Sequence, residues 1–269
     1  MPARSHRVKI RVLGCHGSDQ LLDRTQGHHQ CRTCGFLVNG TVMVDAGTIG
    51  AALRLDEQRR IRHILLSHLH FDHVQGLPTL ADNLVDDAAD SVELIGTVQV
   101  IGGLRRYLFN DKVYPNFMAL PHPKRPIFKT RTFKAGQETE VGGLTVTPIR
   151  VNHLVPTVGF LVREGSSSFL YSGDTYETEQ IWKMAAREPT LKAVFIEASF
   201  PDELAELARV SKHLTPTLLV RAFQKIKRPD LPVYVYHVKP RFRDDIARQL
   251  ARFRLPNLTV LEEGQEIVV

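Results

Sequence analysis

The stretch ILLSHLHFDHVQGLP, from Ile64 to Pro78, constrains this chain more than any other part of its sequence. An apolar run typical of a buried strand is followed at once by three histidines and one aspartate, which are His68, His70, Asp72 and His73. Imidazole and carboxylate groups are costly to bury unless something pairs with them. Burial alone therefore does not explain these residues, and a partner must be found for them.

A divalent metal ion is the partner that this pattern predicts. Neutral imidazole nitrogen and carboxylate oxygen suit zinc and similar ions, and a tight loop at the end of a strand can aim several side chains at one point. Two ligand sets interleaved on one loop can also hold two ions close together. The alternative is a cluster of surface histidines that binds no metal. Four candidate ligands in this order disfavour that alternative.

The rest of the chain alternates strand and helix patterns in both halves, which predicts an α/β fold of two packed sheets with helices outside. Asn39-Gly40 between two apolar runs predicts a hairpin, and residues 49–60 predict a helix. Prolines interrupt residues 109–126, so we expect an irregular lid or binding segment there. We see no internal repeat or low-complexity linker and treat residues 1–269 as one domain.

Composition narrows the class of protein further. The chain has 269 residues, 43% hydrophobic content and a net charge of +6, which suits a globular protein with an anionic partner. Its three cysteines are too few for a disulfide framework, and no signal-peptide pattern or membrane-spanning apolar run is visible. We therefore expect a cytoplasmic protein without a membrane partner. The basic residues are scattered, which disfavours a nucleic acid partner, and a homodimer stays open.

With VDAG upstream at residues 44–47, the histidine motif resembles the signature of the metallo-β-lactamase superfamily. This resemblance implies a four-layer αββα sandwich of two mixed sheets with helices outside. It also implies ligands for two metal ions, which are His68, His70 and His153 for one ion, Asp72, His73 and His237 for the other, and Asp174 for both. Asp45 in VDAG matches a position that supports a ligand, with a turn-capping aspartate as the alternative.

Several further blocks resemble the class II cyclic-nucleotide phosphodiesterases. They are FNDKVYPNF (109–117), VPTVGFLV (155–162), FIEASFPDE (195–203), SKHLTP (211–216) and HVKP (237–240). The resemblance implies hydrolysis of 3′,5′-cyclic nucleotides, cyclic AMP or cyclic GMP, to 5′-nucleotides. Two divalent ions would activate a water molecule so that hydroxide attacks phosphorus. We expect zinc, with manganese or iron left open because their ligand preferences overlap.

The same resemblance implies roles for individual side chains. His213 is the candidate acid that protonates the leaving O3′, and Glu197 would orient it, as in the related tRNA 3′-processing nucleases. A helix cap is the alternative for His213. Asp72 is assigned as a catalytic residue as well as a ligand. The candidate substrate-binding residues, with structural packing as the alternative for each, are Tyr114, Phe117 and Lys239.

Three other functions compete with this prediction. A tRNA 3′-processing endonuclease fits the ligands and the basic charge, but the sequence has no long basic insertion for gripping tRNA. A lactone or thioester hydrolase would share the metals without the HLTP and HVKP blocks. A non-catalytic cyclic-nucleotide-binding protein would not need the complete ligand set.

One segment, residues 18–35, departs from the phosphodiesterase pattern. It contains Cys31-x-x-Cys34 beside His28 and His29. An extra metal site or a redox pair is one interpretation. The other is that each cysteine is a small hydrophobic residue in the core.

Overall fold

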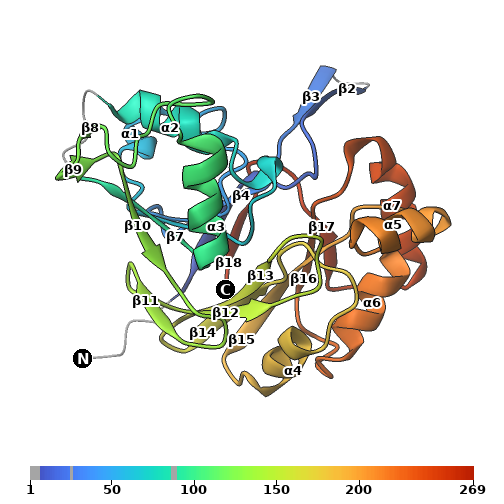
Figure 1. Cartoon of the computed structure of the whole chain (residues 1–269). Coiled ribbons are helices and arrows are strands. Elements are labelled where there is room, and N and C mark those ends of the chain that lie inside the picture. The colour runs from blue at the N-terminus through green and yellow to red at the C-terminus, as the bar shows by residue number, and fades with distance from the viewer. Residues whose placement is uncertain (1–6, 25–26, 86–89) are drawn as a thin grey trace.

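The computed structural model describes residues 7–24, 27–85 and 90–269, and its centre is two mixed sheets packed face to face (Figure 1). The first sheet has seven strands, in the order β10 (Phe128–Thr132), β7 (Val92–Gly96), β6 (His63–Leu65), β5 (Val42–Val44), β4 (Gly35–Val38), β1 (Lys9–Gly14) and β18 (Glu266–Val268). Its strands run parallel from β10 to β5 and antiparallel from there to β18.

The second sheet repeats this mixture. Its seven strands follow the order β11 (Thr139–Val141), β12 (Leu144–Arg150), β13 (Val158–Glu164), β14 (Ser167–Tyr171), β15 (Leu191–Glu197), β16 (Val233–Tyr236) and β17 (Leu258–Val260). Strands β11 to β14 are antiparallel neighbours, whereas β14 to β17 run parallel. Two small hairpins stand apart, β2 (Gln20–Arg24) with β3 (Gly27–Cys31) and β8 (Pro121–His122) with β9 (Arg125–Pro126).

Helices cover the outer face of each sheet, which confirms the predicted four-layer α/β architecture (Figure 1). The helices beside the first sheet are α1 (Leu55–Gln58), α2 (Gly76–Leu84) and α3 (Val98–Gly103), and those beside the second are α4 (Gln180–Arg187), α5 (Ala205–Ser211), α6 (Pro216–Gln224) and α7 (Arg243–Arg252). Short 3-10 turns lie at Phe71–His73, Asp202–Leu204 and Pro240–Phe242, and a π-helical turn lies at Leu104–Leu108. None of the helices in the described ranges is long and apolar enough to cross a bilayer.

The layer between the two sheets is an aromatic core. Phe36 of the first sheet makes edge contacts with Tyr171, Phe195 and Tyr236 of the second, with ring centroids 5.6, 5.9 and 5.6 Å away. All four rings are buried. Because each large apolar side chain contributes about 1.5–3 kcal/mol when fully buried, this layer fixes how the two sheets face each other.

Two local predictions have different outcomes. The Asn39-Gly40 hairpin is confirmed, because β4 and β5 pair across it and both turn residues have positive φ, 49° and 74°. The predicted helix over residues 49–60 is too long, since only Leu55–Gln58 is helical. The Glu57 carboxylate accepts from the backbone N–H of Arg54 at 3.0 Å and starts the helix there. The residues before it form turns instead.

The parallel strands decide where a site can form. Strands β6, β14, β15 and β16 all carry polar side chains just after their carboxyl ends, in the segments HLHFDH, SGD, EAS and HVK. Ligands in α/β folds bind at such an edge, because neighbouring parallel strands bring their following loops together.

Candidate metal centre

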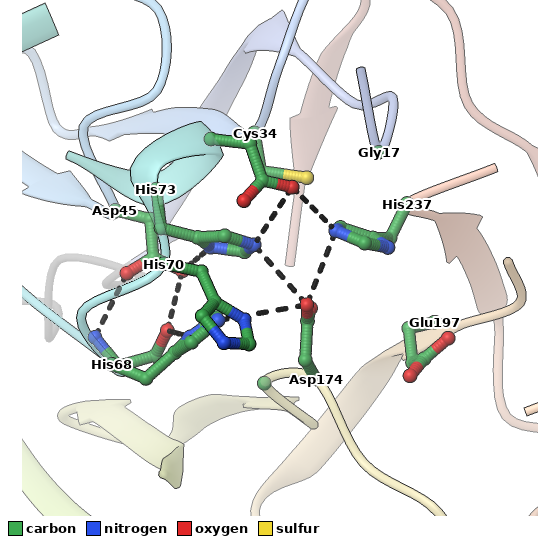
Figure 2. A network of polar contacts seen from close by, with 12 residues as sticks. Gly17, Cys34, Asp45, His68, His70, His73, Asp174, Glu197 and His237 are labelled. Carbon is green, nitrogen blue, oxygen red and sulfur yellow. Dashed lines mark hydrogen bonds and ion pairs between the residues drawn. The ribbon is translucent and has the colours of Figure 1, made fainter. Parts of the chain in front are cut away.

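The structure brings all seven predicted ligand side chains to this edge of the two sheets. Figure 2 labels His68, His70, His73, Asp174 and His237 among them. The structure shows where these side chains lie, and their role as metal ligands stays a prediction. His68, His70, His153 and Asp174 form one group, in which one potential ligand atom of each residue lies within 4.8 Å of the others. Within it, His153 Nε2 lies 3.1 Å from His70 Nδ1, and His68 Nε2 lies 3.7 Å from Asp174 Oδ2.

The second group shares Asp174 with the first. Asp174 Oδ2 lies 3.3 Å from His73 Nε2 and 3.1 Å from His237 Nε2. Asp72 Oδ2 completes the group at 3.2 Å from His237 Nε2 and 3.9 Å from His73 Nε2. Figure 2 shows His73, His237 and Asp174 pointing toward one another from three different segments. Asp174 therefore occupies the position between the two groups.

Asp45 supports the histidines from behind. One of its carboxylate oxygens, Oδ2, accepts hydrogen bonds from His73 Nδ1 at 2.8 Å and from the Tyr171 hydroxyl at 2.7 Å. It also accepts from the Ser67 hydroxyl at 2.8 Å, and that hydroxyl lies 2.9 Å from His68 Nδ1. When Nδ1 of each ring donates into this network, Nε2 of His68 and His73 keeps a lone pair for a metal. Asp45 thus fills the supporting position that the sequence suggested.

His237 is oriented in a similar way. Its Nδ1 lies 2.8 Å from the Ser199 hydroxyl, which donates to Glu197 at 2.9 Å, so Nδ1 carries the proton and Nε2 faces Asp72 and Asp174. His237 also has a positive φ of 61°, a conformation that costs on the order of 1–3 kcal/mol for a non-glycine residue. Gly17 also packs against this ring, and an added Cβ there would lie 2.9 Å from Nδ1.

Burial and charge set the protonation of these groups. Burial lowers the pKa of His68 and of His153 below the usual value and lowers that of His70 to about 4, so these rings are neutral and able to bind metal. Burial also acts to lower the pKa of His73, but the carboxylates of Asp174 and Asp45 outweigh it and raise that pKa well above the usual value. A cation, either a proton or a metal ion, therefore belongs beside His73.

Three buried ligand atoms test whether a metal ion fits. Among the described residues, His68 Nε2, His73 Nε2 and Asp174 Oδ1 are enclosed and have no hydrogen-bond partner. Such atoms cost about 1–3 kcal/mol each when left unsatisfied. All three belong to the predicted ligand set, and their nitrogen and oxygen donors suit zinc or a similar divalent ion. The residues therefore fit the metal centre that the superfamily implies.

Glu197 and His213 form a pair at the rim of this centre. His213 Nδ1 lies 2.8 Å from Glu197 Oε1, and Glu197 also accepts from the backbone N–H of Thr175 at 3.0 Å. The His213 ring stacks on His237 with centroids 5.1 Å apart and contacts His153 edge-on at 5.0 Å. Burial acts to lower the pKa of His213, but the charge and hydrogen bond of Glu197 outweigh it and raise that pKa. A positioned imidazolium beside the ligands can act as an acid.

The three predicted substrate contacts lie in different surroundings. Lys239 donates through Nζ to the backbone carbonyl of Gly17, near the centre. Tyr114 and Phe117 contact each other, and Tyr114 donates to Asp82. Phe117 is only 4% exposed, within the core between the first sheet and its helices. The structure therefore brings Lys239 toward the ligand groups, whereas the buried ring of Phe117 offers no open face for stacking a base.

Three residues near the centre were missed from the sequence. Cys34, fully buried, lies within 4.8 Å of the ligand atoms of His73 and His237, and Figure 2 shows its sulfur pointing between them. Phe71 and Leu154 are 64% and 60% exposed. An aromatic residue inside the polar motif HFDH was a usable signal for Phe71. No spacing links Cys34 to the motif, so only the fold reveals it.

A cavity opens beside His153. Its volume is about 760 Å³, and its lining includes Val98, Lys134, Arg150, Leu154 and Pro156. Sites for small organic ligands occupy about 300–1,000 Å³ and combine apolar walls with a few polar groups. This cavity has the size for a small organic ligand, and Lys134 and Arg150 bring positive charge to its lining.

Comparison with known proteins agrees with this geometry. A family described as "Beta-lactamase superfamily domain" matches residues 23–237. A Yersinia pestis protein named "Probable 3′,5′-cyclic-nucleotide phosphodiesterase" is 28% identical over 210 residues, which cover 69% of this chain and 59% of that protein. This chain therefore spans less than two thirds of the length of that relative.

Solved structures share the fold. Unliganded yeast PDE1 has a TM-score of 0.79 and 17% identity, with 97% of this chain and 99% of that chain covered. Human tRNase Z, short form, has a TM-score of 0.67 and 18% identity, with 96% of this chain and 98% of that chain covered. At these identities the structures establish the architecture and leave the substrate open.

Proposed function

The chain belongs to the β-lactamase superfamily, and from that premise we propose that it is a metal-dependent phosphodiesterase that hydrolyses 3′,5′-cyclic nucleotides to 5′-nucleotides. The observation that carries this proposal is the Glu197–His213 pair beside two complete ligand groups. Phosphodiester cleavage needs a proton for a poor alkoxide leaving group, and His213 can hold one there. The name of the Yersinia pestis relative supports the same reaction.

The ligand groups fit two divalent ions, and we propose zinc. His68, His70 and His153 would hold one ion, Asp72, His73 and His237 the other, and Asp174 would bridge them. Ions bound there would lower the pKa of a water molecule and offset charge that develops on the phosphoryl oxygens. Because the three cysteines of the described chain form no disulfide, a reducing compartment such as the cytoplasm belongs to the same proposal.

The side chains of this protein have separate tasks in the reaction. His213 donates its proton to O3′ as the P–O3′ bond breaks, and Glu197 holds the ring in place and keeps it protonated. Lys239, Lys134 and Arg150 supply positive charge for the phosphate. Phe71 and Leu154 offer exposed apolar surface to the base. Asp45 and Ser199 keep the ligand histidines in the tautomer that points Nε2 toward the centre.

The size of the cavity beside His153 favours a small substrate over tRNA. Its volume of about 760 Å³ suits one nucleotide, whereas a tRNA needs an extended basic surface. The second candidate remains a tRNA 3′-processing endonuclease, because human tRNase Z shares the fold. A shared fold alone does not distinguish a cyclic nucleotide from tRNA as the substrate.

A substrate panel tests this proposal. Cyclic AMP, cyclic GMP, bis(p-nitrophenyl) phosphate and pre-tRNA are offered to one preparation whose metal content is measured. We expect 5′-nucleotide from at least one cyclic nucleotide and no product with the Asp174→Asn variant. Cleavage of pre-tRNA alone would assign the second function instead.

A further inference from the structure

A second cluster of metal-binding side chains lies outside the candidate centre. Cys15, His16 and Glu263 each offer a ligand atom, and these atoms all lie within 4.8 Å of one another. Cys15 and His16 follow the end of β1, whereas Glu263 lies in the turn between β17 and β18. His29 in β3 joins them, because its Nε2 lies 3.1 Å from Glu263 Oε2. Three donors therefore face one another, and His29 approaches this group through the second carboxylate oxygen of Glu263.

One separation among these atoms matches that of neighbouring metal ligands, and the other is that of a hydrogen bond. Cys15 Sγ lies 3.7 Å from His16 Nδ1, and His16 Nδ1 lies 2.8 Å from Glu263 Oε1. Tetrahedral zinc holds its ligands at about 2.0–2.3 Å, so neighbouring ligands are about 3.3–3.8 Å apart. Small rotations of Glu263 and the rings would open such a space. Cys15, His16 and Glu263 are almost fully buried, and His29, with 22% of its side chain exposed, leaves a route from solvent.

We propose that Cys15, His16, His29 and Glu263 form a structural zinc site, separate from the catalytic centre. One thiolate, two imidazoles and a carboxylate are the donors that zinc takes in closed, four-coordinate sites. Binding releases the thiol proton of Cys15 to solvent, and each imidazole binds through the nitrogen that carries no proton. Without zinc the Glu263 carboxylate accepts from both histidines and from the backbone N–H of Arg32 at 2.8 Å, so the segment folds in either state.

The position of the cluster indicates a structural role for the proposed zinc ion. The backbone N–H of His237 donates to the carbonyl of Cys15 at 2.6 Å, and the N–H of Gly17 donates to the carbonyl of Val238 at 3.2 Å. His16 also forms a parallel bridge with Val238. Zinc at this cluster would tie the segment that holds His237 to the C-terminal turn and to β3. It would therefore brace a catalytic ligand without touching substrate.

Cys34 provides a matched control for the experiment. It is a buried free thiol like Cys15, but its sulfur faces His73 and His237. The two cysteines of the C-x-x-C motif thus have different surroundings, since Cys31 lies close enough to Cys15 to help raise its pKa, after burial and Glu263. Cys15 rather than Cys34 is the sulfur donor of the proposed site, because Cys15 groups with His16 and Glu263 whereas Cys34 groups with His73 and His237.

The experiment counts metal ions in the whole chain. Wild type, Cys15→Ser, Glu263→Gln and Cys34→Ser are dialysed against zinc, and metal and protein are measured in the same samples. We expect three zinc ions in wild type and in Cys34→Ser, and two in the other variants. Cobalt gives a second signal, because a thiolate ligand adds a near-ultraviolet charge-transfer band, which Cys15→Ser should abolish.

Several outcomes would overturn the proposal. They are equal zinc content in wild type and Cys15→Ser, or a cobalt band that disappears in Cys34→Ser and stays in Cys15→Ser. If Cys15→Ser does not fold, His29→Ala replaces it in the experiment, because His29 is partly exposed. We expect this variant to raise the dissociation constant of the third zinc ion at least about tenfold. Asp174→Asn separates the two proposals, because it should lose catalytic metal and keep the ion that depends on Cys15.

Discussion

The two clusters of metal-binding side chains differ in how well they are satisfied by protein alone. In the candidate metal centre, His68 Nε2, His73 Nε2 and Asp174 Oδ1 are buried without a hydrogen-bond partner among the described residues. In the cluster around Glu263, one carboxylate accepts from two imidazoles and a backbone N–H. The first arrangement is unstable unless a cation fills it, whereas the second is stable with or without one.

This difference separates the proposed catalytic site from the proposed supporting site. Unsatisfied buried ligands cost about 1–3 kcal/mol each, and an active site tolerates that cost because the ligands must remain open to metal and substrate. A supporting site has no such need, so its side chains can pair with one another. Metal should therefore bind more tightly at the catalytic centre than at the Glu263 cluster, and variants at each cluster can test this contrast.

The largest effect is expected for Asp174→Asn. Asp174 lies between both ligand groups, and the substitution removes the negative charge that each ion would share. Losing the ions removes their contributions to water activation and to charge stabilisation, so cyclic-nucleotide hydrolysis should fall by more than about 10⁴-fold. Turnover and metal content are measured together. Full activity with two ions still bound would contradict the assignment of Asp174.

His213→Gln should have the next largest effect. It removes the proposed acid while leaving the ligand groups intact, so hydrolysis of cyclic AMP should fall about a hundred- to a thousandfold. Bis(p-nitrophenyl) phosphate has a leaving group that needs no proton, so its hydrolysis should fall far less. His122→Gln is the matched control, because His122 is exposed in the β8–β9 hairpin and belongs to neither cluster. Equal losses on both substrates would show that His213 only positions the ligands.

The pH profile gives a sharper test of the same pair. Glu197 raises the pKa of His213, so the acid stays protonated to a higher pH than an isolated histidine would. In Glu197→Gln that pKa falls, and the alkaline limb of kcat should move to lower pH. Activity on this limb follows the protonated fraction of His213, so at a fixed alkaline pH the variant should be slower than wild type. Glu263→Gln should leave the limb unchanged, and a comparable movement of the limb in that variant would contradict the contrast between the clusters.

The sequence predicted which side chains come together in the candidate metal centre because most of them are concentrated in a local pattern. HLHFDH places four ligands on one loop after β6, and the three distant ligands follow strand ends that the family resemblance identifies. The Glu263 cluster has no such pattern. Cys15 and Glu263 are distant in sequence, and only the pairing of β1 with β18 and the fold of the second sheet bring them together.

The sequence was less informative where packing decides the outcome. Phe117 stands in a block that suggests a base contact, yet the core between the first sheet and its helices encloses the ring. Ile49 and Leu53 have helical spacing but are buried from turns, so the predicted helix shrinks to four residues. The apolar character of a side chain favours burial but does not show which layer it enters.

The smallest effect is expected at Gly17, which lies between the two clusters. A Cβ at this position would lie 2.9 Å from Cε1 and Nδ1 of His237 and 3.0 Å from its carbonyl oxygen, so the ring or the segment after His16 must shift. Gly17→Ala should therefore weaken metal binding through His237 and reduce turnover several-fold, because catalysis is sensitive to displacements well below 1 Å. Gly102→Ala is the matched control, since nothing lies within 4 Å of its added Cβ. If Gly17→Ala lowers zinc content only at the Cys15-dependent site and leaves turnover intact, the proposed brace does not reach His237.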